Sequence, residues 1–170
     1  MSVTVRRAGP EDVAALASLR WGWRVDEAGE EPAGTAAQYL QTMSDWWASH
    51  PGHVAVLAQP SDAPEAVGMA WLAMGDRVPS PAGLRPRSAW VQSVYVRPDH
   101  RDRGIGRGML GFVADVARTE NCAYLAVHPS PRSTSLYERC GYASSDGLLE
   151  LRLDSAEVPR ERGGQAVMSR

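Results

Sequence analysis

The stretch VYVRPDHRDRGIGRGML, residues 94–110, decides how this chain folds. It begins with β-branched and aromatic residues that are typical of a strand, and Pro98 ends that strand. Glycines 104, 106 and 108 follow among several arginines, and Ile105 and Met109 begin an apolar pattern with helical spacing. The stretch therefore predicts a strand, a glycine-arginine loop and a helix in direct succession.

The same patterns, read outward from this stretch, predict a mixed α/β chain. We expect strands over residues 3–6, 53–58, 66–74, 89–96, 122–127 and 149–153, and helices over 9–20, 35–49, 105–116 and 130–141. A helix joins the fourth and fifth strands, so these two strands should lie parallel. We predict one domain over residues 1–153, with a central mixed sheet of about six strands and about four helices, and a polar C-terminal tail over residues 154–170.

Composition excludes several classes of function. The chain has 170 residues and a net charge of −2, which does not favour a nucleic-acid partner. Its 18 basic residues are all arginine, so no lysine can act as a nucleophile, a base or a phosphate ligand. The two cysteines and the pair His50 and His53 lack the spacing of a metal site. The first residues contain no apolar signal segment, and we expect a cytoplasmic protein without a membrane partner.

The loop at residues 101–108 has the features of an anion site. A helix N-terminus offers unpaired amides and a partial positive charge, and glycines allow a phosphate to approach the backbone. A dinucleotide-binding fingerprint would need glycine at Met109, and a nucleotide P-loop would need the lysine that the chain lacks. The remaining alternatives are another phosphate-bearing ligand and a plain glycine-rich turn.

Two motifs resemble those of one known family. The segment 101–106, RDRGIG, is similar to the Arg/Gln-x-x-Gly-x-Gly/Ala signature of the GNAT superfamily of N-acetyltransferases. The segment 136–142, LYERCGY, resembles the second hallmark of that family, an apolar residue and a tyrosine followed by Gly-Phe/Tyr. The order of predicted elements also matches, from Val3 to about Leu153.

The resemblance implies a GNAT-like fold, in which the fourth and fifth strands splay apart to hold acetyl-CoA as co-substrate. Val94 and Val96 would pair with the pantetheine arm through main-chain atoms. The pyrophosphate would be held by the loop, that is by Arg101, Arg103, Gly104, Ile105, Gly106 and Arg107. Ser130 stands where many relatives carry asparagine, and its hydroxyl would either contact the cofactor or cap the following helix.

The resemblance also implies direct transfer of an acetyl group to a primary amine. Tyr137 would be the catalytic residue, because a phenol keeps its proton at neutral pH and can share it with a departing thiolate. The backbone amide of Val96 would polarise the thioester carbonyl. Many relatives carry a glutamate base on the fourth strand, whereas this chain offers Gln92 and Ser93, so deprotonation would use water or acids from elsewhere.

The acceptor remains open at the sequence level. Candidate substrate residues are Trp21, Glu27, Glu30, Trp90, Gln92 and Ser93, although the acidic residues also fit a solvated loop. A small amine, an amino-acid derivative, an antibiotic or a peptide amine such as a protein N-terminus would suit such a site, and relatives are often homodimers. Two other classes of function stay open. One is an acyl-CoA-binding regulatory module without turnover, which the missing strand glutamate favours, and the other is an unrelated nucleotide-phosphate binder.

Overall fold

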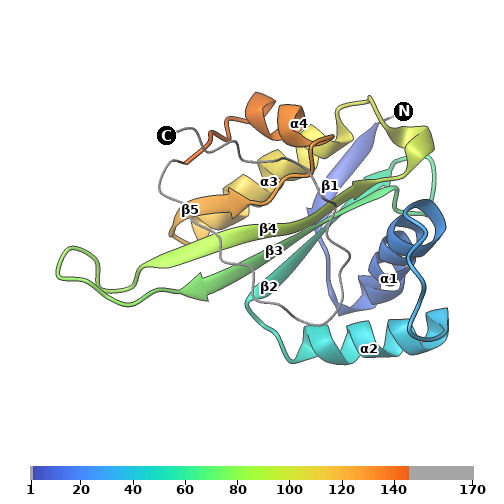
Figure 1. Ribbon diagram of the computed structural model, residues 1–170, viewed down its shortest axis with the longest axis horizontal. Coiled ribbons are helices and arrows are strands. Elements are labelled where there is room, and N and C mark those ends of the chain that lie inside the picture. The colour runs from blue at the N-terminus through green and yellow to red at the C-terminus, as the bar shows by residue number, and fades with distance from the viewer. Residues whose placement is uncertain (1, 146–170) are drawn as a thin grey trace, which may run out of the picture.

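The computed structural model describes residues 2–145 (Figure 1). The strands are β1 (Val3–Arg7), β2 (His53–Pro60), β3 (Gly68–Asp76), β4 (Arg87–Val96) and β5 (Cys122–Val127). The helices are α1 (Val13–Trp21), α2 (Ala36–Ala48), α3 (Ile105–Thr119) and α4 (Thr134–Arg139), with shorter turns η1 (Pro10–Asp12), η2 (Gly22–Glu27) and η3 (Pro98–His100). The predicted sixth strand at 149–153 and the predicted tail at 154–170 lie outside the described residues.

The strands form one mixed sheet in the order β1-β2-β3-β4-β5. β1 to β4 pair antiparallel as successive neighbours, and β5 pairs parallel with β4. The parallel pair is reached through α3, as the crossover prediction required. The predicted mixed α/β sheet is therefore confirmed, with five strands among the described residues.

Helices cover both faces of the sheet, with α1 and α2 on one face and α3 and α4 on the other (Figure 1). β2 illustrates how the sequence supplies two cores. Val54 and Val56 pack with the α3 side, while Ala55 and Leu57, which alternate with them, pack with the α1 side. A strand covered on both faces reads as a continuous apolar run, because its alternate side chains are all buried.

The second helix begins where the sequence predicted. Thr35 precedes it, and its hydroxyl accepts a hydrogen bond from the backbone amide of Gln38 at 3.2 Å. The Thr35 amide in turn donates to Oε1 of the Gln38 side chain at 2.8 Å, which completes a capping box. Met43 is buried on the apolar side of α2, against the same core as α1.

The first helical segment extends beyond its predicted end at residue 20. The chain continues from α1 through the π-helical turn η2 as far as Glu27, and Gly29 then leaves the helix with φ at +71°. Trp23 explains the extension, because its ring stacks on the Tyr95 ring with the centroids 5.9 Å apart. This contact packs η2 against β4 of the sheet, so that Glu27 at the end of η2 lies near β4.

The predicted cap of the fourth helix is also wrong. α4 begins at Thr134, and Ser130 lies in the turn before it. The Ser130 carbonyl accepts hydrogen bonds from the Ser133 amide at 2.9 Å and from the Thr134 hydroxyl at 3.2 Å. Such local side-chain bonds favour a turn over a helical start.

No helix within residues 2–145 has the length and apolarity needed to cross a membrane.

Candidate functional site

The site lies where β4 and β5 part. Their pairing ends at the contact between Val91 and Val127, while β4 continues to Val96 against β3 alone. The outer edge of the segment 92–96 therefore has no strand partner among the described residues. Backbone groups on such an edge must find other partners, and a bound chain that carries amides can supply them.

A β-bulge marks the same point. Trp71 of β3 faces Ser93 and Leu72 faces Val91, so Gln92 is the extra residue on β4. The insertion changes the phase of the strand. Val91 packs in the core of the α3 face, whereas Tyr95 packs in the core of the α1 face. Without the bulge, both side chains would point to the same face.

The parting of the strands opens a cavity of about 790 Å³. It is lined by parts of η2, β4, the loop before α3, the end of β5 and α4. The predicted residues that line it are Glu27, Gln92, Ser93, Val94, Val96, Arg101, Gly104, Ile105, Gly106, Arg107, Ser130 and Tyr137. The fold thus brings most of the predicted site residues to one continuous hollow.

The loop before α3 presents its backbone to this cavity. Asp102 has φ at +60° and Gly104 has φ at +77°, so two of three consecutive residues are left-handed. The first helical bond of α3 runs from the Gly108 amide to the Gly104 carbonyl at 2.9 Å. The amides of residues 105–107 precede that bond, and all three residues line the cavity. This arrangement suits an anion, because the amides and the helix dipole point positive charge toward it.

Gly106 joins the two motifs. A Cβ atom at this position would lie 3.3 Å from Cδ2 of Leu136, which is tighter than an ordinary contact. The missing side chain allows the first turn of α3 to approach α4. The neighbour of Leu136 in α4 is Tyr137, so this approach brings the tyrosine to the same cavity as the loop.

Tyr137 is mostly buried, with 7% of its surface exposed. Burial raises the pKa of its phenol, and the nearby Cys140 adds to the effect. The Tyr142 ring holds it edge-on, with the centroids 5.3 Å apart. Within residues 2–145 the Tyr137 hydroxyl makes no hydrogen bond. The raised pKa keeps the phenol protonated at neutral pH, and the residue lines the cavity.

Arg101 crosses the mouth of the cavity. Its Nε donates to the Val96 carbonyl at 3.0 Å, and its Nη2 donates to both carboxylate oxygens of Glu27 at 2.7 Å. The guanidinium carbon also lies 5.8 Å from the centre of the Tyr95 ring. Burial raises the pKa of Tyr95, and the charge of Glu27 adds to this effect. Arg101 thus links the anion loop, the free edge of β4 and the end of η2.

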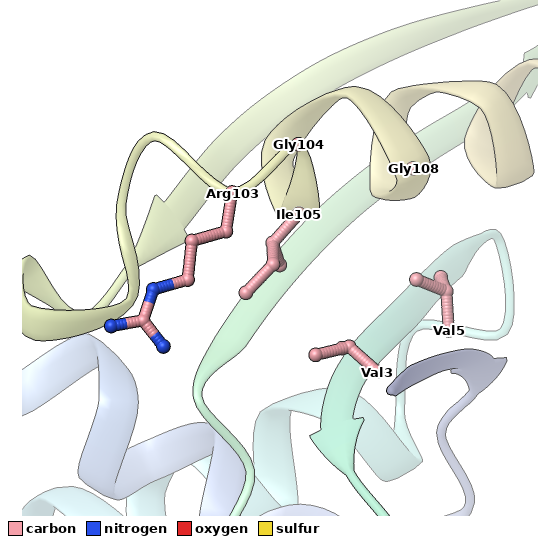
Figure 2. A pocket seen from close by; sticks show the side chains of 6 residues that line it. All are labelled: Val3, Val5, Arg103, Gly104, Ile105 and Gly108. Atoms are coloured by element: carbon pink, nitrogen blue, oxygen red, sulfur yellow. The ribbon is translucent and has the colours of Figure 1, made fainter. Parts of the chain in front are cut away.

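Other predicted residues lie outside this cavity. Glu30 pairs with Arg24, and neither Trp21 nor Trp90 is part of the lining. The Trp90 ring instead stacks on His128 with the centroids 5.2 Å apart. Arg103 belongs to a second hollow of about 210 Å³ beside β1. Figure 2 shows its side chain pointing away from Gly108 and from the side chains of Val3 and Val5.

The structure adds residues that the sequence reasoning did not select. Tyr95, His100, Arg132, Ser133 and Arg139 also line the cavity. The Nδ1 atom of His100 is buried and has no hydrogen-bond partner among residues 2–145. His100, Arg132 and Arg139 could have been selected from the sequence, because basic residues cluster around both motifs. Tyr95 carried no such signal, because its position depends on the bulge.

The arrangement can bind an extended ligand that carries an anion at one end. The loop amides and the arginines at 101, 107, 132 and 139 would hold the anion, and the free edge of β4 would hold an amide-bearing arm. A donor at Tyr137 lies along the same cavity. Among the described residues, no three metal-ligating side chains come close enough together to hold an ion.

Comparison with solved structures places this fold among acetyltransferases. A predicted acetyltransferase with acetyl-CoA from Clostridium acetobutylicum is 22% identical, with a TM-score of 0.70 over 89% of this chain and 96% of that chain. Glucosamine-6-phosphate N-acetyltransferase from Arabidopsis thaliana is 13% identical, with a TM-score of 0.68 over 91% of this chain and 100% of that chain. An aminoglycoside N-acetyltransferase in complex with CoA is 15% identical, with a TM-score of 0.66 over 89% of this chain and 94% of that chain.

At these identities the structural likeness shows the fold alone, and the family follows from the sequence. No curated protein sequence matches the chain. The model of the acetyltransferase (GNAT) family matches residues 14–142, which include the splayed strand, the glycine-arginine loop and Tyr137. The chain therefore belongs to the GNAT family of acetyltransferases.

Proposed function

We propose that this protein transfers an acetyl group from acetyl-CoA to a primary amine by direct attack of the amine on the thioester. One observation carries the proposal. A single cavity joins an anion-binding loop, an unpaired strand edge and a protonated tyrosine. These are the groups needed for the pyrophosphate, the pantetheine arm and the leaving thiolate of this co-substrate.

The orientation of β4 supports a role for its backbone in polarising the thioester. The Arg97 amide bonds to the Val67 carbonyl at 2.9 Å, so residue 97 faces β3. Residues alternate along a strand, and therefore the amide and carbonyl of Val96 face the open edge. The Val96 carbonyl, bonded there by Arg101, agrees with this orientation. The Val96 amide would donate to the thioester oxygen, on which negative charge develops during attack.

Tyr137 would assist the sulfur. As the amine nitrogen bonds to the acetyl carbon, the carbon–sulfur bond breaks and the electron pair moves to sulfur. The phenol then gives its proton to this thiolate. The amine loses a proton to solvent, and a proton from solvent converts the resulting phenolate back to the phenol. Because burial raises the pKa of Tyr137, the phenol holds its proton throughout the neutral range.

A single substitution tests the catalytic role. Tyr137→Phe should lower kcat by about 100-fold, the usual contribution of one proton donor. The affinity for acetyl-CoA should stay unchanged, because the ring and its packing against Tyr142 remain. The measurement is thiol release from acetyl-CoA with a panel of primary amines, together with calorimetric titration of acetyl-CoA.

Tyr142→Phe is the matched control. The Tyr142 hydroxyl is buried without a hydrogen-bond partner among residues 2–145, and the residue does not line the cavity. Its removal should leave turnover intact. Equal turnover of wild type and Tyr137→Phe would contradict the proposed role of the phenol.

A regulatory module without turnover is the second candidate. It is favoured by Gln92 and Ser93, which occupy positions of β4 where many relatives carry a glutamate base. Such a module would bind acetyl-CoA but release no thiol with any amine in the panel. Thiol release by the wild-type protein that depends on Tyr137 would exclude this candidate.

A further inference from the structure

The carboxylate of Glu27 is engaged by a residue of the anion loop. Both of its oxygens accept from Nη2 of Arg101, and both residues line the main cavity. The two are 74 positions apart in the chain. The contact therefore depends on the extra turn η2, which brings Glu27 to the mouth of the cavity.

Arg101 has two possible anionic partners. Its side chain reaches Glu27, while its own backbone starts the loop whose amides suit a phosphate. The Glu27–Arg101 pair is partly open to solvent, with side-chain exposures of 31% for Glu27 and 35% for Arg101. Ion pairs of this kind contribute little to stability, whereas a phosphate group can take several charge-assisted bonds at once.

We propose that acetyl-CoA draws Arg101 away from Glu27, and that the released Glu27 carboxylate then binds the acceptor as a cationic amine, which loses one proton to solvent before the neutral amine attacks the thioester. The co-substrate would thereby create the acceptor site that the following step requires. This inference rests on the function proposed above, and it adds the class of acceptor and the order of events.

The composition of the cavity wall singles out Glu27. Among residues 2–145, the carboxylates that line the cavity are those of Glu27 and Asp102, and Asp102 belongs to the anion loop itself. The polar groups of β4 at the cavity, Gln92 and Ser93, carry no charge. Ser93 is already engaged, because Nη1 of Arg20 donates to its hydroxyl at 2.6 Å.

The surroundings of Glu27 fit an amine attached to an apolar or aromatic body. Trp23 and Tyr95 line the same end of the cavity, and their rings are stacked. An aromatic surface beside a carboxylate binds both the apolar body and the charge of such a molecule. Acceptors that carry a negative charge next to the amine would be repelled by the released carboxylate.

The test uses Glu27→Gln, which keeps the shape of the side chain but not its charge. If Glu27 competes with the co-substrate for Arg101, removing its charge should tighten acetyl-CoA binding about two- to fivefold. Calorimetric titration of the purified full-length chain measures this change. Weaker acetyl-CoA binding by the variant would overturn the proposal, because it would mean that Glu27 holds Arg101 ready for the phosphate.

A charged and a neutral probe test the acceptor part. Phenethylamine should bind the CoA-saturated protein at least about fivefold more tightly than the protein alone, and Glu27→Gln should abolish that gain. Phenethyl alcohol, which has the same body without the charge, should show no gain. Equal affinity of phenethylamine for wild type and variant, or no binding to either, would overturn the assignment.

Glu30→Gln is the matched control for both measurements. Glu30 lies three positions further along, pairs with Arg24 and does not line the cavity. Its substitution should change neither affinity. Failure of the wild-type protein to bind acetyl-CoA would instead overturn the proposed function itself, so the two failures are distinguishable.

Discussion

Gly104 holds the backbone conformation on which the anion loop depends. Its φ of +77° lies in the left-handed region, and a Cβ atom there would meet no other atom within 4 Å. Substitution by alanine therefore brings backbone strain without a steric clash. Gly104→Ala should destabilise the fold by about 1 kcal/mol. It should also weaken acetyl-CoA binding, because relief of the strain turns the loop amides away from the phosphate.

Gly111 provides a control with the opposite sign. It lies within α3, has an ordinary φ, and a Cβ atom there would also meet nothing within 4 Å. Gly111→Ala should stabilise the protein by about 0.5–1 kcal/mol, because alanine is the better helix former. Urea unfolding of both variants measures the two changes. Equal effects of the two substitutions would contradict the role assigned to the conformation of Gly104.

At the scale of elements, α2 is expected to support the fold without taking part in the chemistry. Thr35→Ala removes the capping box and should cost about 1 kcal/mol of unfolding free energy. Thr42→Ala, in the exposed middle of the same helix, should change the stability by less than about 0.5 kcal/mol. Neither variant should alter acetyl-CoA affinity, because α2 contributes no residue to the cavity. A loss of affinity in Thr35→Ala would show that α2 positions η2.

The elements themselves were largely predictable from the sequence, whereas the bulge in β4 was not. Strand and helix patterns were clear because β2 and α2 bury regular sets of apolar residues. The insertion at Gln92 depends on pairing with Trp71 and Leu72, which are distant in the sequence. The bulge places Ser93 and Tyr95 on the α1 side of the sheet, and the local pattern of β4 could not reveal this change of face.

The fourth helix and η2 illustrate the same limit. Ser130 and Pro131 have the residue types of a helix start, but bonds from Ser133 and Thr134 to the Ser130 carbonyl favour a turn. η2 extends the first helix because the Trp23 ring stacks on the ring of Tyr95, which is distant in the sequence. At η2 a long-range contact outweighs the local preference, whereas before α4 one local preference, the turn, outweighs another, the helix start.

At the scale of the whole molecule, the sheet converts two separate motifs into one site. The glycine-arginine loop follows β4, and Tyr137 follows β5, so the parting of these strands determines that both meet at one cavity. The sequence predicted this meeting through the resemblance of the motifs and the order of elements. It could not predict the contact between Arg101 and Glu27, because the two residues are 74 positions apart in the chain.

Calorimetric titration of the full-length protein with acetyl-CoA, and with ATP and inorganic pyrophosphate for comparison, tests the central claim most directly. The loop alone would bind all three anions, whereas the loop together with the free edge of β4 favours the ligand with a pantetheine arm. We predict micromolar binding of acetyl-CoA, with a preference of at least about tenfold, or 1.4 kcal/mol, over both other ligands. Equal affinity for the three ligands, or no binding of acetyl-CoA, would contradict the assignment of this cavity.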